Sequence, residues 1–171
     1  MKDKHDAATA IREATERFVA ECSSATDGQW SFCPAPGAWS MAHVAEHVAI
    51  SNGNLHSVLS KRLLESPMQS RRADVLDVEI PYLFYRGDEP PNLATPSGTW
   101  TDRQRALDSV NSSSTTILEW ADAVARDLRE VGVVHPVFGL MDGVQWLLFA
   151  AAHYERHRAQ LIGLKSRAGS V

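Results

Sequence analysis

The sequence predicts an all-α protein, a four-helix bundle that forms one domain over residues 1–171. Apolar residues recur at helical spacing in four long segments, and no run of alternating apolar and polar residues is bounded by hairpin turns. Four amphipathic segments with heptad-like stripes are typical of a bundle, in which ligand sites are built from side chains on facing helices. With 171 residues the chain can bury one substantial core and is too short for two domains of usual size.

The first two helices are expected on either side of the polar stretch SSATDG. The apolar stripe of the first consists of Ala7, Ile11, Ala14, Phe18 and Cys22. The second begins at WSMAHV, where Ser40 is a favourable N-cap and Trp39 can pack on Val44 as a hydrophobic staple. Its stripe consists of Met41, Val44, Val48, Leu55 and Leu59.

The last two helices each begin with a capping-box pattern. In TDRQ the pair is Thr101 and Gln104, and in DGVQ it is Asp142 and Gln145. The stripe of the third helix consists of Leu107, Val110, Ile117, Ala121, Val124 and Leu128. The fourth helix is expected to continue to about Ser166.

A long crossover separates the second and third helices. It runs from Pro67 to Trp100, about 35 residues, which is much longer than a usual bundle connection. Its aromatic residues Tyr82, Phe84 and Tyr85 could line a pocket at one end of the bundle. A surface excursion that covers only its own small cluster is an equally good interpretation.

Composition and charge exclude several classes of function. The chain is 44% hydrophobic and 22% charged with a net charge of −4, so no broad basic surface for nucleic acid is expected. The longest apolar run is far below the roughly 20 residues that span a bilayer, and no signal peptide is recognisable, so we expect a cytoplasmic protein without a membrane partner. We interpret Cys22 and Cys33 as structural thiols, although they could pair in an oxidising compartment.

Two histidines in the stretch AAHYERHRAQL are the first candidates for a site. At about 100° per residue, His153 and His157 lie in the middle of the apolar stripe of the fourth helix, and both point inward. A single buried histidine is more often a core residue with a hydrogen-bond partner than a ligand. Two on one inner stripe favour a metal, which would satisfy both imidazoles at once. His5, His56 and His135 are expected to be structural or solvated.

The second helix offers a third ligand in the stretch HVAEH. His47 lies about 60° from the centre of the apolar face at Val44, His43 lies about 100° away, and Glu46 points roughly to the opposite side. His47 is therefore the predicted third ligand, while His43 is expected to support the site or to lie at the surface, with a role as a ligand as the less favoured alternative. HVAEH also matches the HxxEH pattern of inverzincin peptidases, but three fixed letters are weak evidence outside the structural context of those enzymes.

Taken together, these residues resemble the DinB/YfiT-like superfamily. The similarity is in PAPGAWSMAHVAEHV, in HPVFGLMDGVQWLLFAAAHYERHRAQL and in PSGTWT, and it extends from about Trp30 to Leu164. It implies a four-helix bundle with a long crossover, frequent homodimers, and a divalent metal such as nickel or zinc on His47, His153 and His157. Three imidazoles would also suit iron or copper.

The resemblance leaves the reaction open. Thiol-dependent S-transferase or isomerase chemistry, with a low-molecular-weight thiol and a small-molecule substrate, is the first hypothesis. A hydrolase that uses water activated by the metal is the alternative. The helical-face argument places no carboxylate inside the bundle as a general base, which favours thiol chemistry slightly, and no catalytic residue is assigned. A bundle that binds metal or a partner without catalysis is the third hypothesis.

Overall fold

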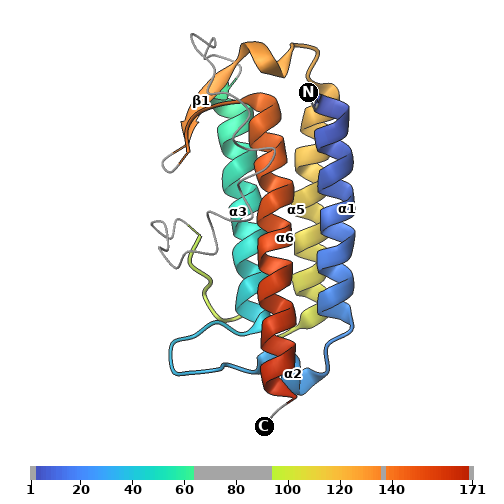
Figure 1. Ribbon diagram of the computed structural model, residues 1–171, viewed down its shortest axis with the longest axis vertical. Helices are drawn as coiled ribbons and strands as arrows, with labels where there is room; N and C mark the ends of the chain where they lie inside the picture. Colours follow the sequence, from blue (N-terminus) through green and yellow to red (C-terminus); the bar gives the residue numbers. More distant parts are fainter. Residues whose placement is uncertain (1–2, 64–93, 136–137, 170–171) are drawn as a thin grey trace.

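The computed structural model describes residues 3–63, 94–135 and 138–169. The four long helices α1 (Lys4–Ser23), α3 (Met41–Lys61), α5 (Arg103–Ala123) and α6 (Gly143–Ala168) lie side by side (Figure 1). The shorter elements are the helix α2 (Asp27–Ser31), the 3-10 turn η4 (Leu128–Glu130) and the strands β1 (Gly132–His135) and β2 (Gly139–Asp142). The predicted four-helix bundle is confirmed.

The helix directions explain why a long crossover is needed. Helices α1 and α6 run one way along the bundle, and α3 and α5 run the other way (Figure 1). Helices α3 and α5 are packed neighbours, as are α1 and α6. A parallel neighbour requires the chain to return over the length of a helix, roughly 30 Å for 21 residues, before the next helix begins. The predicted pocket-lining residues Tyr82, Phe84 and Tyr85 lie outside the described residues.

Most of the predicted stripes and caps are present. Every residue of the stripes predicted for the first two helices is buried. Ser40 caps α3 and Asp142 caps α6, each in a complete capping box. Asp142 is fully buried, and its second oxygen pairs with Arg129 at 2.8 Å, which joins the start of α6 to the turn η4.

Three details differ from the sequence-based expectation. The N-cap of α5 is Asp102 and not Thr101, because the Asp102 carboxylate accepts the hydrogen bond from the Arg105 backbone N–H. The helix ends at Ala123, so Val124 is its C-cap and the buried Leu128 belongs to η4. A short antiparallel hairpin of β1 and β2 precedes α6 in the chain, and each of its strands has only four residues.

A layer of polar side chains crosses the core of the bundle. One of them, Tyr154, follows the predicted ligand His153 in the sequence. The fully buried Tyr154 hydroxyl accepts a hydrogen bond from the Asn52 amide at 2.7 Å, and the same amide donates to Ser113 at 3.0 Å. The Thr15 and Ser114 hydroxyls share a hydrogen bond of 2.9 Å. These contacts join four helices and satisfy the buried polar groups, as a packed core requires. No helix among the described residues is both long and apolar enough to cross a bilayer.

Candidate metal centre

The structure brings His47, His153 and His157 together. Helix α6 places His153 and His157 one turn apart on its buried face, where they are 8% and 2% exposed. Helix α3 lies beside α6 and contributes the partly buried His47. The Nε2 atom of His153 is 3.1 Å from Nε2 of His157 and 3.3 Å from Nε2 of His47, and one ring nitrogen from each of the three lies within 4.8 Å of the others.

Hydrogen bonds on the far side of two rings orient them. The Nδ1 of His47 is 2.8 Å from the Ala94 carbonyl oxygen, which can only accept, so this Nδ1 carries the proton. The Nδ1 of His157 likewise donates to the Gln160 side-chain oxygen at 2.9 Å. In a neutral imidazole the other nitrogen then carries a lone pair, and here that nitrogen is Nε2; the Ser51 hydroxyl also lies 3.4 Å from Nε2 of His47. Two lone pairs are therefore directed at the centre of the cluster.

Burial keeps the imidazoles neutral. Loss of hydration, followed by the nearby His47, lowers the pKa of His157 to about 3. Burial, followed by the imidazoles of His157 and His47, also lowers the pKa of His153 well below its ordinary value. Neutral imidazole is the form that binds a metal ion, so these ligands need not lose a proton at neutral pH.

The donor set fits a divalent ion. A proton on Nε2 of His153 can be donated to only one of the two neighbouring lone pairs, whereas a cation would satisfy all three nitrogens. Zinc–nitrogen bonds of 2.0–2.1 Å in a tetrahedral site place two nitrogens roughly 3.3 Å apart. The two Nε2 separations of 3.1 and 3.3 Å are close to that value. Two of the three separations therefore fit zinc or a metal of similar size, and the third is at most 4.8 Å.

Aromatic rings surround the cluster. Trp39 packs on His47 with ring centroids 4.9 Å apart, and Phe149 stacks on His153 at 5.8 Å. His135, expected to be structural or solvated, packs against Phe149 at 4.9 Å and Trp146 at 5.1 Å. Burial lowers the pKa of His135 to about 4, so it too stays neutral at pH 7. Sequence periodicity could not place His135, because it belongs to the hairpin and not to a helix.

Glu46 and Glu155, which lie near the histidines in sequence, bind groups outside the histidine cluster. Among the described residues, the cluster that could hold a metal contains no carboxylate. Glu155 pairs with Arg17 at 2.7 Å and with Arg158 at 2.9 Å. Glu46 is 2% exposed, and its oxygens accept hydrogen bonds from Ser97 and Gly98. Neither carboxylate belongs to the cluster, in line with the expectation that Glu46 points away from the predicted ligands.

His43 also lies outside the cluster of three. Its Nδ1 is 2.7 Å from the Ser40 hydroxyl and accepts a hydrogen bond from the Ser40 backbone N–H, so the ring completes the capping box of α3. His43 was expected to support the site or to lie at the surface, and the structure shows it partly buried as part of the helix cap. Sequence reasoning missed the acceptors Ala94, which contributes only a backbone carbonyl, and Gln160, which accepts from His157.

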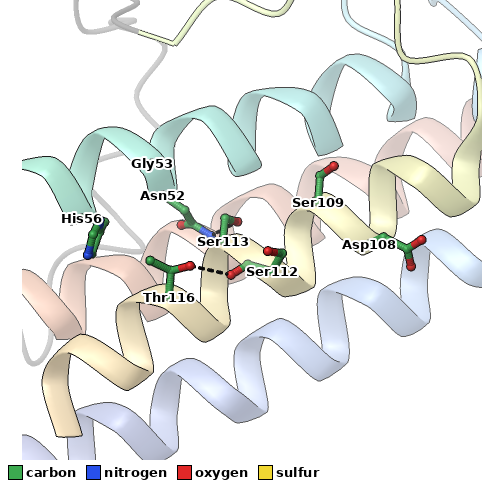
Figure 2. A pocket seen from close by; sticks show the side chains of 8 residues that line it. All are labelled: Asn52, Gly53, His56, Asp108, Ser109, Ser112, Ser113 and Thr116. Carbon is green, nitrogen blue, oxygen red and sulfur yellow. Dashed lines mark hydrogen bonds between the residues drawn. The ribbon is translucent and has the colours of Figure 1, made fainter. Parts of the chain in front are cut away.

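A separate hollow of about 510 Å³ lies between α3 and α5 (Figure 2). Hydroxyl side chains line it, among them Ser109, Ser112 and Thr116, and none of the three clustered histidines does. Thr116 donates a hydrogen bond to the Ser112 backbone carbonyl. Asn52 is its buried polar group, and both amide hydrogens of Asn52 are directed at Tyr154 and Ser113. His56 and Asp108 also line the hollow, but among the described residues no group of three possible metal ligands lies there.

Comparisons with known proteins agree with the fold. The family model of the DinB superfamily matches residues 10–161. The solved structure of YfiT from Bacillus subtilis, described as a probable metal-dependent hydrolase with an unusual four-helix bundle topology, is similar with a TM-score of 0.65 and 17% identity, over 97% of this chain and 87% of that one. TT2238, described as a four-helix bundle protein, is similar with a TM-score of 0.62 and 19% identity, over 94% of this chain and 98% of that one. No curated protein sequence matches this chain.

Proposed function

The chain belongs to the DinB superfamily, and we propose that it is a divalent-metal-dependent enzyme whose ion is held by His47, His153 and His157. The observation that carries this proposal is the convergence of three Nε2 atoms from two helices, with the Nδ1 atoms of His47 and His157 held by acceptors. Zinc and nickel are the favoured ions because both suit imidazole ligands, and iron is the next candidate.

We favour thiol-dependent transfer or isomerisation of a small-molecule substrate. With three neutral protein ligands, a bound divalent ion would keep its full charge and would supply Lewis acidity that lowers the pKa of a thiol or of water. Hydrolysis benefits from a general base within hydrogen-bond reach of the attacking water. Glu46 and Glu155 are held by other partners, which supports the thiol hypothesis. The aromatic rings of Trp39 and Phe149 exclude water from two sides of the histidines.

A metal-dependent hydrolase is the second candidate. The observation that favours it is the similarity to YfiT, which is described as a probable metal-dependent hydrolase. At 17% identity this similarity supports a shared fold and does not identify the reaction. The two candidates differ in their need for a thiol: a transferase should turn over only with glutathione, mycothiol or bacillithiol, whereas a hydrolase should act without one.

The first test is the metal content of protein purified without an affinity tag or added metal. We expect close to one equivalent of zinc, nickel or iron per chain, and a strong loss in His153→Ala. His56→Ala is the matched control, because His56 lies on α3 outside the histidine cluster and should leave the metal content unchanged. Equal, low metal in all three proteins, with no thermal shift on adding zinc or nickel, would overturn the proposal and leave a bundle with core histidines.

A further inference from the structure

Helix α3 uses the stretch HVAEH to hold residues 94–99, the end of the crossover. The Glu46 carboxylate accepts three hydrogen bonds from this segment: from the Ser97 backbone N–H at 2.7 Å, from the Ser97 hydroxyl at 2.5 Å, and from the Gly98 N–H at 3.0 Å. One residue further along the helix, His47 donates from Nδ1 to the Ala94 carbonyl oxygen. Adjacent residues of α3 therefore bind the two ends of one short segment.

The anchor at Glu46 is strong and specific. Its side chain is almost completely buried, and a buried carboxylate without partners would cost several kcal/mol. Hydrogen bonds to a carboxylate are about twice as strong as those between neutral groups. The Ser97 hydroxyl also accepts from the Thr99 N–H at 3.2 Å, so the bound turn is braced internally.

Gly98 fits closely against α3. Its φ of +75° favours glycine, and a Cβ atom there would lie 2.9 Å from Nε2 of His43. The imidazole of His43 is fixed in turn by Ser40, so it cannot move away without loss of the capping box. The turn at residues 97–98 is thus held in one position against α3.

The position of the turn restricts the position of the Ala94 carbonyl. Three residues span at most roughly 10 Å, so Ala94 cannot drift far from an anchored Ser97. His153 and His157 are buried and share one helix, and the partner of His157 Nδ1, Gln160, lies on that helix as well. His47 differs because its Nδ1 acceptor comes from a segment 47 residues away. The orientation of this ring therefore depends on a long-range contact.

We propose that Glu46 is a positioning residue for the metal centre: it anchors Ser97 and Gly98, and thereby holds the Ala94 carbonyl against Nδ1 of His47 and keeps the Nε2 lone pair directed at His153. The inference rests on the proposed metal site. It assigns to the glutamate of HVAEH a structural contact with the crossover in place of a general-base role.

The test is zinc affinity measured by competition with a chromophoric chelator. Outer hydrogen bonds of this kind change metal affinity by about 10–100-fold, and we expect a loss of that order in Glu46→Ala and a smaller one in Glu46→Gln. Glu155→Gln is the matched control: it also removes a carboxylate close in sequence to the proposed ligands, two residues from His153 and His157, but one that pairs with arginines, and it should bind zinc as the parent does. Gly98→Ala displaces the same turn without altering Glu46 and should weaken zinc binding as well.

A second readout reports the ring itself. In the metal-free parent, ¹⁵N NMR should show His47 with its proton on Nδ1, whereas Glu46→Ala should give a mixture of tautomers. Unchanged zinc affinity and an unchanged His47 tautomer in folded Glu46→Ala would overturn the inference. If Glu46→Ala does not fold, Gly98→Ala and Ser97→Ala decide by the same criteria.

The outcomes separate this inference from the proposed function. If the parent binds zinc, His153→Ala does not, and the Glu46 variants bind like the parent, only the positioning role fails. If the parent and His153→Ala both fail to bind metal, the proposed function fails, and the tautomer of His47 still decides whether Glu46 orients the ring.

Discussion

Acid should destabilise the metal-free protein through its buried imidazoles. His157 has a pKa lowered to about 3 by burial, whereas in the unfolded chain the same group titrates near 6.5. Between these two values the unfolded chain binds more protons than the folded protein, so the free energy of unfolding falls as the pH falls. The contribution is fully present above pH 6.5 and is lost progressively toward pH 3. From pH 6.5 to pH 5, one such group removes about 2 kcal/mol.

Urea unfolding of chelator-treated protein at pH 7 and pH 5 measures this effect. Carboxylates that are stabilised by folding change stability in the same direction, so the comparison is with His157→Leu, which removes the titrating ring and keeps an apolar side chain. We expect the parent to lose about 2 kcal/mol more than His157→Leu between the two pH values. His56→Ala should lose as much as the parent. An equal loss in the parent and in His157→Leu would refute the reasoning.

Three further predictions concern the core. Tyr154→Phe leaves one buried N–H of Asn52 without its acceptor and should lower the free energy of unfolding by about 1–3 kcal/mol in urea titrations; no change would mean that the amide finds another partner. Burial raises the pKa of Cys22 to about 12, so an aromatic disulfide reagent at pH 8 should modify only the exposed Cys33 in the native protein and both thiols after denaturation. Gly143→Ala places a Cβ atom 2.9 Å from two leucine side chains and should cost about 1–3 kcal/mol, seen as a lower melting temperature.

The sequence predicted those parts of the site that depend on a single helix. His153 and His157 are four residues apart in a periodic segment, so helical geometry alone places both rings on one inner face. The same argument placed His47 at the border of the interior, and it is indeed partly buried. Whether the three bind a metal stays a prediction that the metal analysis tests.

Contacts between segments distant in sequence could not be predicted in this way. The acceptor for His47 is the backbone carbonyl of Ala94, a group that every residue carries, and no pattern distinguishes it. The hairpin of β1 and β2 escaped prediction because four residues are too few to show alternation, and its position depends on packing, such as the hydrogen bond from the Trp146 indole to the Val133 carbonyl. Glu46 was correctly placed away from the ligands, but its burial depends on Ser97 and Gly98.

The topology links the crossover to the metal centre. Parallel α3 and α5 require a chain segment that returns along the bundle, and the last described part of that segment, residues 94–99, lies against the first turns of α3. Two ligands are set by α6 itself, while the third depends on this return segment. A change in the crossover can therefore alter metal affinity without touching a ligand. For the proposed metal centre, we therefore expect substitutions in residues 94–99 to change metal affinity while the bundle core stays unchanged.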